Sequence, residues 1–210
     1  MKKTLWLSAL VILPFACGGA LPVFAADDGF YLGVSGGQSR ASFDTAGALA
    51  GAPAGTTLTV DTSETAWKVF GGYQVNKYFG GELNYVDLGK YNFSGMTLGI
   101  PFSGDAKVNG WGLAAVGTLP LDKGFSLFGK LGAFYSKVDV SATASAFGVT
   151  ASASASENKW VPQYGIGAKY DFNPNVSVRI EAERFQGMGS NTTTIKTDAN
   201  LYTIGLSYKF

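Results

Sequence analysis

Large apolar residues alternate with small or polar ones in several segments of the chain, and the C-terminal segment shows this most clearly. Within Leu201–Phe210, every second residue from Tyr202 onward is large and apolar. A β-strand turns successive side chains to opposite faces, so this spacing predicts a strand with one apolar face. A soluble protein rarely leaves such a strand at an exposed edge, whereas a strand in a lipid-embedded barrel requires an apolar face.

The same alternation predicts seven further strands. They lie near Gly29–Gln38, Thr65–Val75, Tyr78–Leu88, Lys107–Leu119, Phe125–Val138, Lys159–Phe172 and Val176–Phe185. Each strand is close to the ~9–11 residues that a tilted strand needs to cross a bilayer. We therefore expect an all-β fold, an eight-stranded antiparallel up-and-down transmembrane β-barrel. The competing interpretation, a soluble β-sandwich, would need a second sheet to cover the apolar faces.

The connections between the expected strands alternate between short and long. The short ones, Asn76-Lys77, Leu121–Gly124 and Asn173–Asn175, are rich in turn-forming residues. The long ones run over residues 39–64, 90–106, 139–158 and 187–199. Outer-membrane barrels have short periplasmic turns and longer outer loops, so we expect both ends of the barrel domain on the periplasmic side. Alternating β formers within Ser141–Ser156 leave open a hairpin that continues beyond the membrane.

Aromatic residues gather at the expected strand ends, where membrane barrels carry interfacial girdles. The periplasmic girdle would contain Tyr73, Tyr78, Tyr170, Phe172, Tyr208 and Phe210. The outer girdle would contain Tyr85, Tyr91, Trp111, Tyr135 and Trp160.

The N-terminal segment has the pattern of a secretory signal. A basic start precedes a short apolar run that Pro14 interrupts, and Val23-Phe24-Ala25 suits a signal peptidase. The run is short for a membrane anchor, which is the alternative. We expect cleavage after Ala25, with a signal peptide at residues 1–25 and an outer-membrane β-barrel domain at residues 26–210.

Composition argues against several classes of function. Lys and Arg number 16 and Asp and Glu 15, so no basic excess indicates nucleic acid, and the chain has no histidine. Barrel enzymes use a base poised near neutral pH. Asp87, Asp105 and Glu157 near the outer rim have no nucleophile at a matching spacing. The single cysteine, Cys17, lies in the expected signal. We expect no catalytic residue, metal or cofactor.

The inward positions of the expected strands carry glycines and charges of both signs. These charges include Lys68, Glu82, Lys130, Arg179, Glu181 and Glu183. An eight-stranded barrel has room inside for side chains alone, and buried charges must be paired. We therefore expect a lumen filled by ion pairs, with glycines making room for long side chains. Two interpretations remain: a structural filling, or a gated ion path that opens by exchange of ion-pair partners.

Four segments, Gly71–Phe79, Tyr85–Gly89, Gly129–Ala133 and Arg179–Phe185, carry a family resemblance. Taken together with the strand pattern, they make the chain similar to the outer-membrane protein A transmembrane domain and to small surface antigens of the opacity and OmpX types. The resemblance implies lumen ion pairs formed by Glu82, Lys130, Arg179 and Glu181. It also implies a C-terminal assembly signal, read by the barrel-assembly machinery, at Thr203, Gly205, Tyr208 and Phe210. No peptidoglycan-binding domain follows Phe210, so we expect no role in tethering the cell wall.

These observations favour a non-enzymatic protein of the Gram-negative outer membrane that contributes to envelope structure and displays loops for adhesion. The candidate loops are Ala46–Thr59, Ser141–Ser156 and Gly189–Thr197, although they could also be solvated connections without a partner. The alternative function is a narrow channel or transporter for small solutes or hydrophobic molecules. Expected partners are outer-membrane lipid and lipopolysaccharide, the assembly machinery, and a host or cell-surface ligand.

Overall fold

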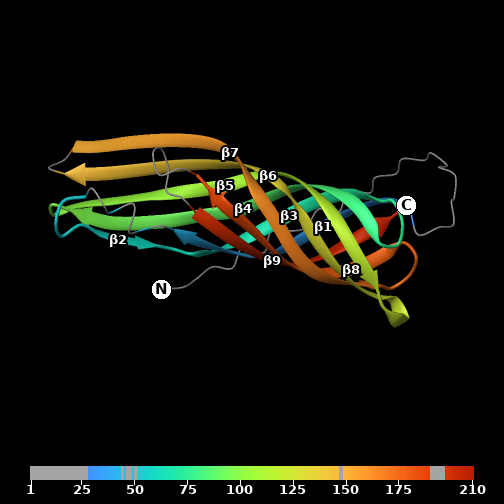
Figure 1. The fold of residues 1–210 in the computed structure, drawn as a ribbon. Coiled ribbons are helices and arrows are strands. Elements are labelled where there is room, and N and C mark those ends of the chain that lie inside the picture. Colours follow the sequence, from blue (N-terminus) through green and yellow to red (C-terminus); the bar gives the residue numbers. More distant parts are fainter. Residues whose placement is uncertain (1–27, 44, 46–48, 50–51, 147–148, 190–196) are drawn as a thin grey trace.

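The computed structural model describes residues 28–43, 45, 49, 52–146, 149–189 and 197–210, and within them eight long strands form a closed antiparallel barrel (Figure 1). The barrel strands are β1 (Gly29–Phe43), β3 (Ser63–Gln74), β4 (Phe79–Thr97), β5 (Ile100–Pro120), β6 (Phe125–Ala146), β7 (Val149–Asp171), β8 (Val176–Met188) and β9 (Thr197–Lys209). Neighbours in the chain pair with each other, and β1 pairs with β9 to close the ring. The expected all-β, eight-stranded antiparallel barrel is confirmed.

Two short elements complete the described fold. The strand β2 (Thr57–Val60) pairs with β4 residues Phe93–Met96, outside the ring. The 3-10 turn η1 (Asp122–Gly124) connects β5 to β6. No helix in the described part of the chain has the length and apolar character of a membrane span. The expected signal peptide at residues 1–25 lies outside the described residues.

The outer wall of the barrel is apolar, as the alternation predicts. Leu131, Ile166 and Ile204 are each more than 60% exposed on this wall, while their chain neighbours turn inward. On β5, where the alternation is least regular, Trp111 and Leu113 also point outward. An exposed apolar wall of this kind is stable in hydrocarbon and unfavourable in water.

Two aromatic girdles bound the apolar wall. At the end with the short turns, Phe125 packs against Tyr170 with ring centroids 4.6 Å apart. Toward the other end, Tyr135 packs against Trp160 at 5.1 Å. Phe125 and Tyr135 lie on the same strand, and the separation of the two girdles along the barrel axis is about 25 Å for a strand tilted as in outer-membrane barrels. This height matches the apolar band of such proteins.

Strands β4 to β7 continue beyond the second girdle as a projecting sheet, on the side opposite to the C-terminus (Figure 1). Residues 90–106, expected as a loop, are strand on both sides of a tight turn, and the pairing reaches Thr97↔Ile100. Residues 139–158 form the hairpin that the sequence left open, paired as far as Ala146↔Val149. Phe147 and Gly148 lie outside the described residues, as do part of Ala46–Thr59 and most of Gly189–Thr197.

A bulge in β4 moves one expected girdle residue into the barrel. Asp87 pairs with Asn109 and Gly89 with Val108, so Leu88 is an extra residue, and Gly89 has a φ of +97°. One inserted residue reverses which positions of a strand face inward. Tyr91 therefore points into the lumen and is fully buried. The expectation that Tyr91 belongs to the outer girdle was wrong.

Candidate functional site

Six charged side chains from strands β3, β4, β6 and β8 meet in the middle of the lumen. They form the ionic cluster, which consists of Lys68, Glu82, Lys130, Arg179, Glu181 and Glu183. All six are buried, and the three cations balance the three carboxylates. The alternation of the strands brings these residues together, because each occupies an inward position.

Lys130 contacts all three carboxylates of the ionic cluster. Its Nζ lies 2.6 Å from Glu82 and 3.1 Å from Glu183, and it also pairs with Glu181. Lys68 pairs with Glu181 at 2.5 Å and with Glu183. Because each carboxylate of the cluster is held by at least two cations, the loss of one cation leaves several buried negative charges undercompensated.

Arg179 anchors the side of the ionic cluster nearest the short turns. Its Nη1 lies 2.9 Å from Glu82 and its Nη2 3.1 Å from Glu181. The guanidinium lies between two aromatic rings, 4.3 Å from the centroid of Phe70 and 4.5 Å from that of Phe128. Cation–π contacts of this kind stabilise a desolvated guanidinium.

Neutral residues complete the hydrogen bonding around the carboxylates. Tyr31 donates a hydrogen bond from its hydroxyl to Glu82 at 3.1 Å, and Gln163 donates one from its amide to Glu183 at 2.9 Å. Sequence reasoning did not include Tyr31, Phe70 or Phe128 in this site. The sequence feature that could have indicated the two rings is the glycine that faces each of them from another strand. A Cβ on Gly33 would lie 2.3 Å from the Phe70 ring, and a Cβ on Gly167 would lie 2.3 Å from the Phe128 ring.

The half of the lumen toward the projecting sheet is apolar, which the sequence analysis did not predict. Its buried residues form the apolar plug, which consists of Ala41, Ala66, Val86, Leu88, Tyr91, Val108, Phe134, Val138, Val161, Phe185, Met188, Ala199 and Leu201. Phe134 and Phe185 pack with ring centroids 4.6 Å apart. The hydroxyl of Tyr91 hydrogen-bonds to Ser39, which gives the buried phenol a partner. The lumen is thus filled by two chemically different materials.

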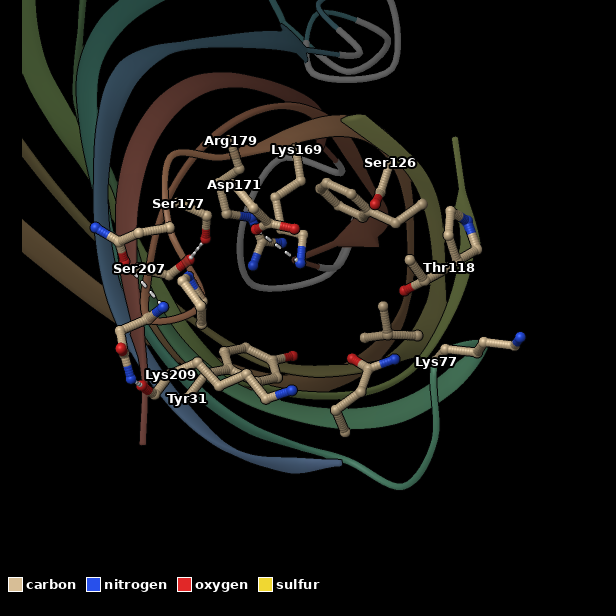
Figure 2. Close-up of a pocket in the computed structure, with 17 residues that line it drawn as sticks. Tyr31, Lys77, Thr118, Ser126, Lys169, Asp171, Ser177, Arg179, Ser207 and Lys209 are labelled. Atoms are coloured by element: carbon tan, nitrogen blue, oxygen red, sulfur yellow. Dashed lines mark hydrogen bonds and ion pairs between the residues drawn. The ribbon is translucent and has the colours of Figure 1, made fainter. Parts of the chain in front are cut away.

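A cavity of about 290 Å³ opens at the end of the barrel with the short turns (Figure 2). Lys169 and Asp171 point into it and pair at 3.1 Å. Ser177 and Ser207 share a hydrogen bond of 2.7 Å at its wall. Arg179 lines the cavity and also belongs to the ionic cluster, so the cavity ends where the cluster begins.

The carboxylates near the outer rim are engaged in ordinary contacts. Asp87 accepts a hydrogen bond from the Gly89 amide at 2.9 Å, and Asp105 lies 3.1 Å from Lys90. Among the described residues, no group of His, Cys, Asp and Glu side chains is arranged to hold a metal ion.

The residues of the expected assembly signal lie on β9 and at its end. Thr203 and Gly205 face inward, and a Cβ on Gly205 would lie 2.5 Å from the Ser35 side chain. Tyr208 and Phe210 face outward, with their ring centroids 5.1 Å apart. Two aromatic side chains are therefore displayed on the outer surface at the end of the closing strand.

Comparison with known proteins places these features in context. The model of the OmpA-like transmembrane domain family matches residues 25–210. The outer membrane protein A of Shigella flexneri is 29% identical over 144 residues, and that of Salmonella typhi is 30% identical over 142 residues. Each alignment covers 67% of this chain and 39% of the relative, so the chain spans about two fifths of the length of these relatives.

A solved structure has the same fold. The crystal structure of Neisserial surface protein A superposes with a TM-score of 0.58 at 15% sequence identity, covering 86% of this chain and 97% of that one.

Proposed function

Because this chain belongs to the OmpA-like transmembrane domain family and lies in the outer membrane of a Gram-negative bacterium, we propose that it is a closed, non-enzymatic barrel that contributes to envelope structure and displays an extracellular sheet for adhesion. The cavity then faces the periplasm, and the projecting sheet of β4 to β7 faces the outside of the cell. The same proposal includes a signal peptide at residues 1–25, which N-terminal sequencing of the mature protein tests.

One observation carries the proposal: the lumen is filled while the extracellular strands are extended. The ionic cluster and the apolar plug occupy successive levels of the barrel. Outside the membrane, β6 and β7 remain paired from Lys137↔Asn158 to Ala146↔Val149. Eight or more residues of ordered strand per side present a binding surface without the entropy cost that a flexible loop would incur on binding.

The contacts of the polar side chains support a non-enzymatic role. The chain contains no histidine, and Asp87 and Asp105 are held by Gly89, Lys90 and Lys107. A general base must reach a nucleophile or a water at hydrogen-bond distance, with a pKa near the working pH.

Removal of the extracellular hairpin tests the proposal. Residues 141–154 would be replaced by a two-residue Asn-Gly turn joining β6 to β7, which leaves every girdle residue in place. We expect cells with this variant to lose adhesion to surfaces and to other cells, while detergent resistance of the envelope stays normal. Complete deletion of the protein should impair both. Adhesion that survives removal of the hairpin would contradict the adhesive role.

The assembly role that we propose for the last residues has its own test. Phe210→Ser should lower the amount of heat-modifiable barrel in outer-membrane fractions, because the assembly machinery would no longer find a terminal aromatic residue. Phe172→Ser, which changes an equally exposed aromatic residue in the same girdle, is the matched control. Equal barrel levels for both variants would argue against a signal at Phe210.

A further inference from the structure

The outer face of the projecting sheet, which consists of β4 to β7 with β2 at its edge, carries rows of side-chain hydroxyl groups that cross several strands. In one row, each residue is the direct cross-strand partner of the next: Thr59, Ser94, Ser103, Thr143 and Ser152. Paired residues of an antiparallel sheet point to the same face, about 4.8 Å apart, and alternate residues along a strand are about 7 Å apart. The next row contains Asn92, Asp105, Ser141 and Ser154. These two rows form an array of hydrogen-bonding groups on the outer face of the sheet.

The middle of this array is hollowed. A depression of about 420 Å³ is lined by the hydroxyl groups of Thr59, Ser94, Ser103 and Thr143, together with the side chains of Asp61 and Asp105. Each hydroxyl can both donate and accept a hydrogen bond, while the carboxylates accept. Hydroxyl-rich ligands have the complementary set of donors and acceptors.

The charges around the depression select against anionic ligands. Lys90 lies 3.1 Å from Asp105, Lys107 lies 3.7 Å from Asp87, and Lys137 lies 3.1 Å from Asp139. A hydrogen bond from Ser156, together with Lys137, lowers the pKa of Asp139, so this carboxylate keeps its charge beside the lysine. The three described lysines of this face are thus balanced by three aspartates, and Asp61, which lines the depression, adds one further negative charge. Sulfated, sialylated or phosphorylated ligands would meet net repulsion.

The position of the array also bears on its ligand. The face that carries these hydroxyl groups, the hydroxyl face, continues the outer wall of the barrel. It begins beyond Trp111, Tyr135 and Trp160, which form the girdle at the outer membrane surface. The opposite face of the sheet packs toward the apolar plug through Phe93, Val138 and Val140. The hydroxyl face is therefore turned sideways, toward whatever surrounds the barrel above the membrane.

We propose that this depression binds an uncharged glycan chain. The proposal rests on the adhesive role given above and names the ligand class for the same sheet. The array supplies hydrogen-bonding groups in rows, the net negative charge around the depression disfavours anionic chains, and the position places the surface among cell-surface polysaccharides.

The test uses the full barrel in lipid nanodiscs, prepared without sugar-based detergent, on a printed array of bacterial and host glycans in uncharged, sialylated and sulfated groups. We expect binding to uncharged glycans. The known source of each glycan on the array then shows whether the bound chains belong to bacterial envelopes or to host cells. The double variant Ser103→Ala with Thr143→Val should bind the strongest of these glycans at least about tenfold more weakly, because two hydrogen-bonding hydroxyls are lost.

Thr150→Val is the matched control, because Thr150 lies on the same face outside the depression and hydrogen-bonds to Ser145. It should bind as the wild type does. Gel mobility with and without boiling verifies the barrel in every variant, and Thr143→Val alone, which keeps a β-branched residue in the strand, serves if the double variant does not assemble. A blank array, stronger binding of sulfated chains, or unchanged binding by the variants would overturn the proposal. If the array is blank while loss of the hairpin still abolishes adhesion, the adhesive role stands and the glycan assignment falls.

Discussion

The two halves of the lumen are both filled by side chains, but one half is filled by charged groups and the other by apolar groups. Toward the short turns, the ionic cluster fills the barrel with three cations and three carboxylates, each fixed by specific partners. Toward the projecting sheet, the apolar plug fills it with aliphatic and aromatic side chains. Charged groups require defined geometry because an unpaired buried charge is very costly, whereas apolar packing is non-directional and depends on volume. The cluster should therefore be sensitive to charge and the plug to size.

The largest effect is expected from a single charge deletion in the cluster. Lys130→Met keeps most of the side-chain volume but leaves Glu82, Glu181 and Glu183 with fewer cations, and should lower the free energy of unfolding by about 4–5 kcal/mol. Urea unfolding in lipid vesicles, followed by gel mobility, measures it. The matched control is Lys137→Met, whose exposed pair with Asp139 should contribute less than about 1 kcal/mol. Equal losses of unfolding free energy in the two variants would mean that the buried charges of the cluster contribute no more to stability than an exposed ion pair.

A volume deletion in the plug should have a slightly smaller effect. Phe134→Ala removes a fully buried ring that packs on Phe185, and should cost about 3–4 kcal/mol through lost contacts and the cavity left behind. Phe125→Ala, on the same strand but facing lipid, is the control, since lipid chains can fill the space that it leaves. The same unfolding assay applies to both. A loss at Phe125 as large as that at Phe134 would show that the plug is not tightly packed.

The hydrogen bond between Tyr91 of the plug and the neighbouring Ser39 should give the smallest effect. Tyr91→Phe removes a hydroxyl that contacts Ser39, and both residues are fully buried. We expect a loss of about 1 kcal/mol, which is typical of a single hydrogen bond. Tyr135→Phe on the outer wall should change stability by less than half of that. If Tyr91→Phe stabilises the barrel instead, the plug behaves as a purely apolar core.

The difference between the two halves also explains what the sequence could predict. The ionic cluster follows from strict alternation: Glu82, Lys130 and Arg179 lie in regular strands where every second residue faces inward. One plug residue, Tyr91, lies beyond the bulge at Leu88, where the alternation of β4 changes phase, and the bulge position depends on how β4 pairs with β5. Tyr91 was therefore not recognisable as a lumen residue, whereas Phe185 continues the inward alternation of Glu181 and Glu183 and could have been recognised.

The projecting sheet was only partly predictable for a different reason. Within the membrane, lipid requires an apolar wall, which gives the strands a strong pattern. Outside it, Ser and Ala alternate in Ser141–Ser156, with little difference in size or hydrophobicity between the two faces. Such a pattern allows a strand as well as a loop, and the pairing of whole strands β5 to β7 decides between them.

The central claim is that the two fillings close the lumen, and conductance across planar lipid bilayers tests it most directly. We predict no steady current from the purified barrel, nor from Phe134→Ala, because the ionic cluster still blocks the lumen between the plug and the short turns. Steady current steps from the wild-type protein, altered in size by Lys130→Ala or Glu82→Ala, would contradict the account and show that the lumen is an ion path.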